Sequence, residues 1–409
     1  MKLLIRMQTG PTRKPAAAKQ QRAPEFAGEH PGMRIFMTTD TIGSVWTFTR
    51  ELVEQYMQRG HSVVLMSLGP APTETQRAWC EQMRRASPTQ FHFEPCTSPL
   101  EWMDDNEHAY IAPAPTMLRI VETFKPHVMH TSQYCFGALP TLVPRVVTAH
   151  SDLLSWSAAC RPRGIDPAPW LDRYLVMVQR GLDNADAVVA PTAWMLSALE
   201  RNFRVSRPRS VIAQGRSLEP GNQPVFVQTY EPQAVTVGRL WEQEKNLALL
   251  TEARSAMPIV LARRRRYGVP YLMERHPSIR LSPPLSEAGL LNLFRESSVY
   301  VSPSLYEPFG LAALEAALCG CAVVANDLPS LREVWGDAAT YFTSPAELEV
   351  ILAKLNDDPA ALAEARQQSH ARALQLNATA MADSYLALYE KLIQRTAVPA
   401  SAGNLQRAG

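Results

Sequence analysis

Residues 33–66 read MRIFMTTDTIGSVWTFTRELVEQYMQRGHSVVLM, and this stretch decides the fold class. The apolar run 35–38 predicts a short strand, and a turn follows it. Apolar residues then recur at helical spacing over 45–57, Gly60 ends that helix, and 62–66 predicts a second buried strand. Two buried strands joined by a helix form a βαβ unit, whose strands lie parallel. The stretch therefore predicts an α/β fold built on a parallel sheet.

The same pattern continues along the first half of the chain. Short apolar runs predict further strands at 128–130, 145–150, 187–190 and 210–213. The Pro-rich segment 70–125 leaves the order of the strands open. We assign residues 33–215 to one doubly wound, Rossmann-like domain that would bind the acceptor of the reaction considered below.

A second domain of the same type follows the turn-forming stretch EPGNQP at 219–224. We place a linker at 216–232 and a second Rossmann-like domain at 233–380. Its predicted strands are 234–237, 259–262, 299–302 and 322–325, and its predicted helices are 246–256, 287–296, 310–318, 345–356 and 359–374. Residues 381–409 form a last helix and tail, which we expect to pack back toward the first domain. Two such domains place a cleft between the carboxyl ends of their sheets, where sheets of this type bind ligands.

The first 32 residues differ in composition from the rest. They carry six basic residues against two acidic ones, with Pro, Ala and Gln between them. The apolar start at 1–5 is too short for a secretory signal, which needs an apolar region of about 7 to 15 residues. We interpret 1–32 as a disordered basic leader, with Met33 as an alternative natural start.

Overall composition excludes several classes of protein. The chain has 409 residues, 46% hydrophobic and 20% charged, which is a balance typical of globular proteins. A formal net charge of +2 favours no nucleic-acid partner, and no apolar run approaches the roughly 18 to 20 residues of a transmembrane helix. The six cysteines are scattered, which favours reduced thiols in the cytoplasm over disulfides or zinc. Fibrous, integral-membrane and histone-like proteins are excluded, and peripheral membrane contact stays open.

The strongest functional signal is SLYEPFGLAALEA at 304–316, where a strand runs through a loop into a helix. The first N–H groups of a helix have no partner within it, so the helix start near Gly310 can bind phosphate. Glu315 lies about 7 Å farther along the axis, where a carboxylate can accept hydrogen bonds from a ribose. Glu307 precedes the helix and would face the group that the diphosphate carries. The alternative places Glu307 in a solvated turn and Glu315 on the surface, but the helix around Glu315 is almost wholly apolar, so its carboxylate needs a partner.

A second motif, VGRLWEQEKN at 237–246, places two cations six residues apart after a predicted strand. Arg239 can bind phosphate oxygens through two hydrogen bonds, and Lys245 adds a compact positive charge. Taken alone, the motif is better explained by a loop ion pair with Glu242 or Glu244. Its place at the end of a strand, ahead of the glutamate motif, favours a phosphate site.

Together the two motifs resemble those of the retaining nucleotide-sugar glycosyltransferases of family 4, which have the GT-B fold. The matching positions of the second domain are Gly238, Arg239, Lys245, Asn246, 307–311, Glu315 and Ala316. Those of the first domain are Gly43, 59–63, 146–151 and 185–192. The resemblance spans 33–395 and implies two Rossmann-like domains that face each other across a cleft.

The resemblance implies a role for each matching residue. Arg239 and Lys245 would bind the diphosphate and stabilise the leaving nucleotide. Glu307 would bind hydroxyls of the donor sugar, beside which His150 would lie. The implied catalytic set is His150, Arg239, Lys245 and Glu307. The implied donor-binding set is Gly43 and the diphosphate ligands Arg239 and Lys245, then Glu307, Phe309, the amides of Gly310 and Leu311, and Glu315 at the ribose.

Such enzymes transfer a sugar with retention of the α configuration, without a metal ion or another cofactor. The resemblance therefore implies a metal-independent hexosyltransferase of glycan biosynthesis. Its donor would be a nucleoside-diphosphate sugar, and its acceptor a small molecule, a glycan or a lipid-linked compound. Two cations and a helix start can neutralise a departing diphosphate, which is the role of a metal in other enzymes.

Three departures from the family pattern keep other functions open. They are Ile42-Gly43 in place of two glycines, Ala213-Gln214-Gly215 in place of Pro-Asn-Gly, and four arginines at 263–266 in place of a glycine-rich turn. One alternative is a catalytically degenerate protein of the same fold that binds sugar nucleotides or serves as a scaffold. Another, with less support, is an epimerase or phosphorylase of the same fold. The arginine run fits a solvated basic loop better than a site for an anionic acceptor.

Three more residues have two interpretations each. His127 and His130 flank a predicted strand without a third metal ligand, so we interpret them as core or surface histidines. Trp156 lies six residues after His150, and lining of an acceptor pocket and burial in the core are equally consistent with its position.

Overall fold

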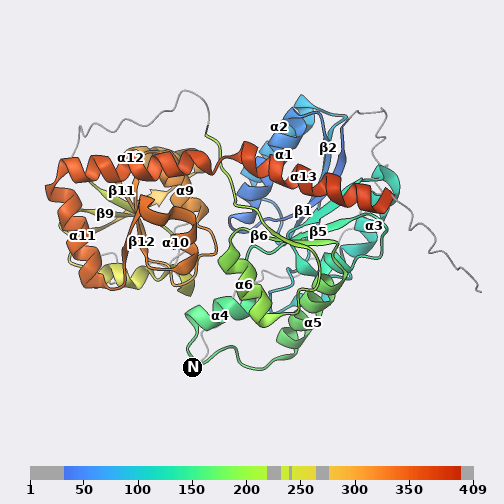
Figure 1. Cartoon of the computed structure of the whole chain (residues 1–409), viewed down its shortest axis with the longest axis horizontal. Helices are drawn as coiled ribbons and strands as arrows, with labels where there is room; N and C mark the ends of the chain where they lie inside the picture. The colour runs from blue at the N-terminus through green and yellow to red at the C-terminus, as the bar shows by residue number, and fades with distance from the viewer. Residues whose placement is uncertain (1–31, 219–231, 239–241, 264–275, 398–409) are drawn as a thin grey trace, which may run out of the picture.

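The computed structural model describes residues 32–218, 232–238, 242–263 and 276–397, which form two α/β domains (Figure 1). The seven-stranded sheet has the order β3-β2-β1-β4-β5-β6-β7, and the six-stranded sheet has the order β10-β9-β8-β11-β12-β13. Each order reverses beside the first strand of its domain, between β1 and β4 and between β8 and β11. Such a reversal is the switch point of a Rossmann-like sheet. The prediction of two Rossmann-like domains is confirmed.

The first domain supplies the seven-stranded sheet and the helices that cover it. Its elements are β1 (Arg34–Asp40), α1 (Val45–Gln58), β2 (Ser62–Leu68), α2 (Glu74–Ala86), β3 (Phe91–Pro95), α3 (Ala114–Phe124), β4 (Val128–Thr131), β5 (Arg145–Thr148), α4 (Leu153–Cys160), α5 (Pro169–Asn184), β6 (Ala187–Ala190), α6 (Ala193–Asn202) and β7 (Arg209–Val211). Successive side chains of a strand point to opposite faces. Ile35 and Met37 accordingly enter one core with Leu52 of α1, whereas Phe36 enters another with Ile120 of α3.

The second domain supplies the six-stranded sheet. Its strands are β8 (Ala234–Val237), β9 (Ile259–Arg263), β10 (Ile279–Pro284), β11 (Val299–Ser302), β12 (Ala322–Asn326) and β13 (Ala339–Phe342). Its helices are α8 (Glu287–Arg295), α9 (Leu311–Leu318), α10 (Pro329–Trp335), α11 (Pro345–Asp357) and α12 (Pro359–Gln375). The chain then enters the last helix, α13 (Ala378–Ala397). None of the helices in the described residues is long and apolar enough to span a membrane.

Helix α13 leaves the second domain and packs against α1 of the first (Figure 1). The hydroxyl of Tyr389 lies 3.0 Å from that of Tyr56, and Arg59 forms an ion pair of 2.8 Å with Asp383. The Tyr389 hydroxyl also lies 2.6 Å from Nδ1 of His130. Helix α13 therefore packs into the first domain, and Tyr389 belongs to the core of that domain.

The chain crosses between the domains at 215–218 and again at 376–378, and the two crossings touch. The amide of Arg216 donates to the carbonyl of Leu376 over 3.0 Å. A Cβ atom at Gly215 would lie 2.1 Å from the carbonyl oxygen of Asn377, closer than real Cβ atoms approach. Glycine is therefore required where the two crossings meet.

The structure corrects several predicted elements. The helix predicted over 246–256 is wrong, because this region contains only the short 3₁₀ turn η4 (Leu247–Thr251), which follows a first such turn, η3 (Gln243–Lys245). Asn246 between them has φ 47°, a left-handed conformation that interrupts a helix. The strands predicted over 145–150 and 210–213 are Arg145–Thr148 and Arg209–Val211. The proposed leader up to residue 31, the linker from 219 to 231 and the tail from 398 lie outside the described residues.

Candidate functional site

The segments that follow β8 and β11 meet at the switch point of the second sheet. Nζ of Lys245, after β8, lies 2.7 Å from Oε2 of Glu307, after β11. The amide of Leu305 donates to the carbonyl of Glu244 over 2.8 Å, and the Asn246 side chain donates to the carbonyl of Pro303 over 3.1 Å. The structure thus brings together the two sequence motifs at the place where sheets of this type bind ligands.

Lys245 keeps its positive charge in this position. Burial alone would lower the pKa of its ammonium group, but the neighbouring carboxylate of Glu307 raises that pKa above its usual value. The two side chains are 26% and 19% exposed, so a ligand can reach both. Lys245 therefore pairs with a residue of the other motif, whereas a loop ion pair of Arg239 with Glu242 or Glu244 would involve a residue outside the described ones.

The N-cap residue of α9, Gly310, lies three residues after Glu307. Gly310 has φ 94°, and this left-handed residue turns the loop into the helix. The side chains of Phe309 and Leu311 are only 3% and 6% exposed, within a hydrophobic core. A ligand at this helix start would therefore meet backbone amides rather than these two side chains.

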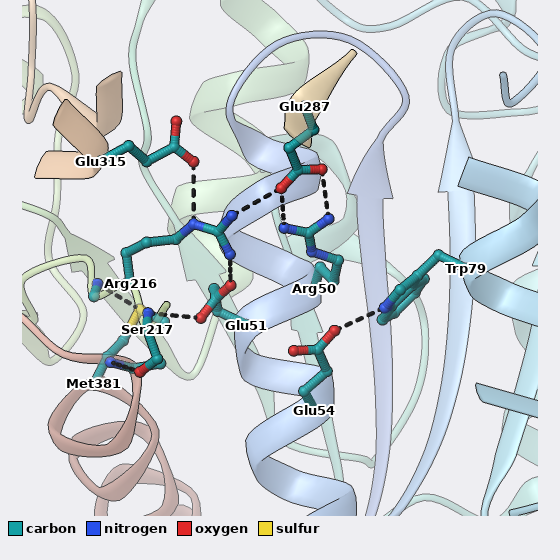
Figure 2. Close-up of polar contacts among 11 residues, drawn as sticks. Arg50, Glu51, Glu54, Trp79, Arg216, Ser217, Glu287, Glu315 and Met381 are labelled. Atoms are coloured by element: carbon teal, nitrogen blue, oxygen red, sulfur yellow. Dashed lines mark hydrogen bonds and ion pairs between the residues drawn. The ribbon is translucent and has the colours of Figure 1, made fainter. Parts of the chain in front are cut away.

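Glu315, on α9, has a buried partner from the linker. Its Oε1 lies 3.0 Å from Nε of Arg216, and the Arg216 side chain is 5% exposed. The same guanidinium binds Glu287 of α8 over 2.8 Å and also Glu51 of α1 (Figure 2). Figure 2 shows Arg216 between the three carboxylates, which come from both domains. We call Arg50, Glu51, Arg216, Glu287 and Glu315 the linker ion cluster.

His150 follows β5 at the carboxyl edge of the first sheet. Its Nδ1 lies 3.2 Å from Nε2 of Gln214, and its Nε2 lies 3.3 Å from Oγ of Ser132. The ring of Phe48 packs edge-on against it at 4.6 Å between centroids. Burial lowers the pKa of His150 to about 3, so the imidazole is neutral at physiological pH. Gly43 lies at the same sheet edge, in the turn after β1, with φ 76°.

Tyr306 joins the first domain to the loop that carries Glu307. Its hydroxyl lies 3.1 Å from Oγ of Ser151 and 2.9 Å from Oγ of Ser155. Nearby, Nε1 of Trp156 donates to Oε2 of Glu244 over 3.1 Å. The neighbours of His150 in one domain therefore contact the neighbours of Glu307 and Lys245 in the other.

Comparison with known proteins agrees with this geometry. Residues 45–219 match Glycosyltransferase Family 4, and residues 231–370 match Glycosyl transferases group 1. Together the matches cover about three quarters of the chain. The chain belongs to the family 4 type of GT-B glycosyltransferases.

A curated relative of this family type is the alpha-maltose-1-phosphate synthase of Mycobacterium tuberculosis, which is 28% identical over 236 residues. This match covers 48% of the chain and 57% of the relative, so the chain spans little more than half the length of that protein. Among solved structures, sucrose-phosphate synthase from Thermosynechococcus elongatus has a TM-score of 0.70 at 17% identity, with 89% of this chain and all of that chain covered. Anabaena HepE in complex with UDP-glucose has a TM-score of 0.66 at 15% identity, with 88% and 100% covered. These two likenesses show the GT-B fold.

The structure places most of the residues that the family resemblance singles out. Lys245 and Glu307 are in contact, Gly310 starts α9, and Glu315 lies on that helix. His150 and Gly43 occupy the facing sheet edge of the first domain. Arg239 lies outside the described residues, as do residues 264–266 of the arginine run.

Several residues at these sheet edges were not predicted. Arg216 follows Ala213-Gln214-Gly215, where the sequence departs from the family pattern, and Tyr306 stands next to Glu307. Neither residue belongs to a sequence motif that would predict its contacts. Asp40 is the last residue of buried strand β1, and a carboxylate there is a signal that could have been noticed. Burial raises the pKa of Asp40 to about 8, although its carboxylate accepts a hydrogen bond from Gln133.

The structure also places the residues with two interpretations. His127 is half-buried directly before β4, where its Nδ1 accepts a hydrogen bond from the amide of Arg34 over 3.1 Å. His130 is 1% exposed and belongs to the core, where Thr148 and Tyr389 bind its two ring nitrogens. Trp156 is half-buried and bridges the domains through Glu244. Over the described part of the chain, no group of three His, Cys, Asp or Glu residues could hold a metal ion.

Proposed function

We propose that the protein is a retaining, metal-independent glycosyltransferase that moves a hexosyl group from a nucleoside-diphosphate sugar to an acceptor hydroxyl. The observation that carries the proposal is the ion pair of Lys245 and Glu307, which lies at the switch point directly before the phosphate-binding start of α9. The complex of HepE with UDP-glucose supports a nucleotide-sugar donor, because that protein shares the fold. The acceptor class stays as the resemblance implies: a small molecule, a glycan or a lipid-linked compound.

In the proposed step, the acceptor oxygen bonds to the anomeric carbon while the bond from that carbon to the diphosphate oxygen breaks. The acceptor proton passes to the departing diphosphate on the same face of the sugar, so the α configuration is retained. Lys245 and the amides at the start of α9 stabilise the negative charge that develops on the diphosphate. Arg239 would add a second cation.

Glu307 and His150 would orient the transferred sugar. The Glu307 carboxylate accepts hydrogen bonds from sugar hydroxyls, and its ion pair with Lys245 ties the sugar position to the diphosphate position. His150 is neutral, so it can donate one hydrogen bond without adding charge beside the donor. The same contacts serve a binding protein equally well, so catalysis must be tested directly.

Two matched substitutions test this assignment. Glu307→Gln should lower donor hydrolysis and transfer by about 100-fold and leave the affinity for free nucleotide nearly unchanged. Glu315→Gln should instead weaken the binding of UDP, GDP or ADP by about tenfold or more, because a charged hydrogen bond to the ribose is lost. Calorimetry and a donor-hydrolysis assay measure both effects, with the exposed Glu364→Gln as the control.

Two outcomes would contradict the proposal in different ways. If neither glutamate substitution alters nucleotide affinity or turnover, both residues are structural and the transferase assignment fails. If nucleotide binds but no sugar is released or transferred with a broad panel of acceptors, the protein is the degenerate sugar-nucleotide binder.

A further inference from the structure

Arg216 lies in the first crossing between the domains, and its side chain reaches Glu315 of the proposed nucleotide site. We propose that Arg216 is a positioning residue for nucleotide binding, which holds the Glu315 carboxylate toward the ribose and makes nucleotide affinity depend on contact between the two domains. The inference rests on the proposed function, because it takes Glu315 as the ribose ligand.

The backbone around Arg216 is fixed by the second crossing of the chain. The amide of Arg216 is bound by Leu376, and Gly215 leaves no room between the crossings. The amide of Ser217 also donates to Oε2 of Glu51 over 3.0 Å. The position of the Arg216 backbone is therefore fixed by the contact between the two crossings and not by the nucleotide site.

The guanidinium of Arg216 distributes its N–H groups over carboxylates from both domains. Nε binds Glu315 on α9, Nη2 binds Glu287 on α8, and Nη1 binds Glu51 on α1 of the first domain (Figure 2). A planar guanidinium with five donors can hold three acceptors at fixed angles, which a lysine ammonium group cannot do in the same way. Burial alone would lower the pKa of Arg216, but Glu51, Glu315 and Glu287 raise it above its usual value, so the charge is permanent.

This contact fixes the position of Glu315 before a ligand binds. A glutamate side chain loses rotamer freedom when it binds a ribose, and a partner that already fixes the rotamer removes part of that cost. Arg216 uses Oε1, and a carboxylate oxygen has lone pairs for a second hydrogen bond. The ion pair is therefore compatible with a ribose diol on the same carboxylate.

The same contact links the site to the domain arrangement. If the domains moved apart, Arg216 would have to leave either Glu51 on one side or Glu287 and Glu315 on the other. An unpaired buried charge is costly, so the cluster favours the arrangement in which all three contacts are made. Nucleotide binding to a fixed Glu315 and domain contact should consequently strengthen each other.

Arg50 provides a matched control within the cluster. It binds Glu287 over 2.8 Å, whereas Glu315 is bound by Arg216, so Arg50→Met removes a guanidinium from the cluster away from the ribose ligand (Figure 2). Calorimetry should show that Arg216→Met weakens UDP, GDP or ADP, whichever the wild type binds, by about tenfold, and that Arg50→Met weakens it by less than about threefold. Arg216→Lys should give an intermediate loss.

A double-mutant cycle separates positioning from a general structural role. In a Glu315→Gln background, Arg216→Met should change nucleotide affinity by less than about twofold, because Arg216 acts through Glu315. If Arg216→Met does not fold, the double variant Glu51→Gln/Arg216→Met keeps the net charge of the cluster unchanged. Its nucleotide affinity, compared with that of Glu51→Gln alone, then measures the effect of Arg216.

The outcomes that overturn the inference differ from those that overturn the function. Arg216 would have a structural role only if Arg216→Met and Arg50→Met lost equal nucleotide affinity. The same conclusion would follow if Arg216→Met weakened nucleotide binding as strongly in the Glu315→Gln background as in the wild type. Loss of affinity in Glu315→Gln with unchanged affinity in Arg216→Met would overturn the inference and leave the proposed function intact. A wild-type protein that binds none of the three nucleotides would overturn both.

Discussion

The side-chain amide of Gln214 lies 3.2 Å from Nδ1 of His150, so a residue at the end of the first domain selects the tautomer of the candidate catalytic histidine. With the amide nitrogen as donor, Nδ1 accepts, and the proton of the neutral imidazole resides on Nε2. Gln214 is one of the departures from the family pattern, and its contact places this position beside the candidate catalytic residue His150.

Gln214→Glu should reverse this arrangement. A carboxylate beside Nδ1 accepts a hydrogen bond from the protonated ring, and its negative charge raises the pKa of His150 from about 3 toward neutrality. Donor turnover should therefore become dependent on pH between about 5 and 8, where the wild-type His150 does not titrate. Nitrogen NMR of the histidine ring reports the tautomer, and Gln214→Met, which brings no charge, is the control. Identical pH profiles in Gln214→Glu and wild type would contradict the prediction.

Lys245→Met should remove the fixed cation at the start of α9. We expect turnover to fall by about 100-fold, because the charge on the departing diphosphate loses a stabilising partner. The measurement is donor hydrolysis at saturating donor, so that weakened binding and slowed chemistry are separated. Lys354→Met, at an exposed position on α11, is the control and should retain activity. Full activity of Lys245→Met would remove Lys245 from the proposed mechanism.

Chelation tests the proposed independence from metal. The positive charges of Lys245 and Arg239, with the start of α9, take the place of a divalent ion in the proposal. Transfer and donor hydrolysis should be unchanged after dialysis against EDTA. Loss of activity that Mg²⁺ or Mn²⁺ restores would refute this part.

Two glycine-to-alanine substitutions should have opposite effects on stability. Gly215→Ala places a Cβ 2.1 Å from the Asn377 carbonyl, so the two crossings must separate, at a cost of about 1 to 3 kcal/mol. In Gly289→Ala, on α8, the nearest atoms would lie 3.4 Å away, and the substitution should stabilise by about 0.4 to 1 kcal/mol. Melting temperatures compare the two proteins directly. An unchanged melting temperature for Gly215→Ala would show that the crossings can shift freely.

Asp40 should make stability fall as pH rises. Burial raises its folded-state pKa to about 8, whereas its ordinary value is 3.8. The folded state therefore holds a proton that the unfolded state releases, and the stabilisation is complete below pH 3.8 and lost as pH rises to about 8. The stability of Asp40→Asn relative to wild type should increase by up to about 1.4 kcal/mol per pH unit inside this window. Denaturant unfolding at pH 5 and 8 measures the difference, with the exposed Asp166→Asn as the control. A constant difference between the two pH values would show that Asp40 titrates normally.

The central strands of both sheets were predictable, and the missing strands share one physical cause. β3, β10 and β13 each lie at a sheet edge, next to a single neighbouring strand. Their residues are partly exposed, as the half-buried stretch in β3 illustrates, so they lack the continuous apolar run that marks β1 or β2. The 3₁₀ turns beside Lys245 were missed for another reason, because the left-handed Asn246 depends on its bond to Pro303.

Contacts within one motif were predictable, and contacts between distant charges were not. Gly310 and Glu307 could be placed by the strand, loop and helix that surround them. The partner of Glu315 is 99 residues away, and the chain has 41 basic residues, none of which the spacing singles out. Only the fold of both domains brings Arg216 between Glu51 and Glu315.

The return of α13 to the first domain has a consequence for the order of synthesis. Strand β7 ends at Val211, and α13 begins at Ala378, so the first domain is complete only after α13 has been made. At about 5 to 20 residues per second, a ribosome takes roughly 10 to 30 s to make the intervening residues. During that interval Tyr56 and His130 lack Tyr389, their partner. A nascent chain that has completed the seven-stranded sheet therefore still exposes the surface that α13 will cover, and release of the twenty residues of α13 closes the first domain.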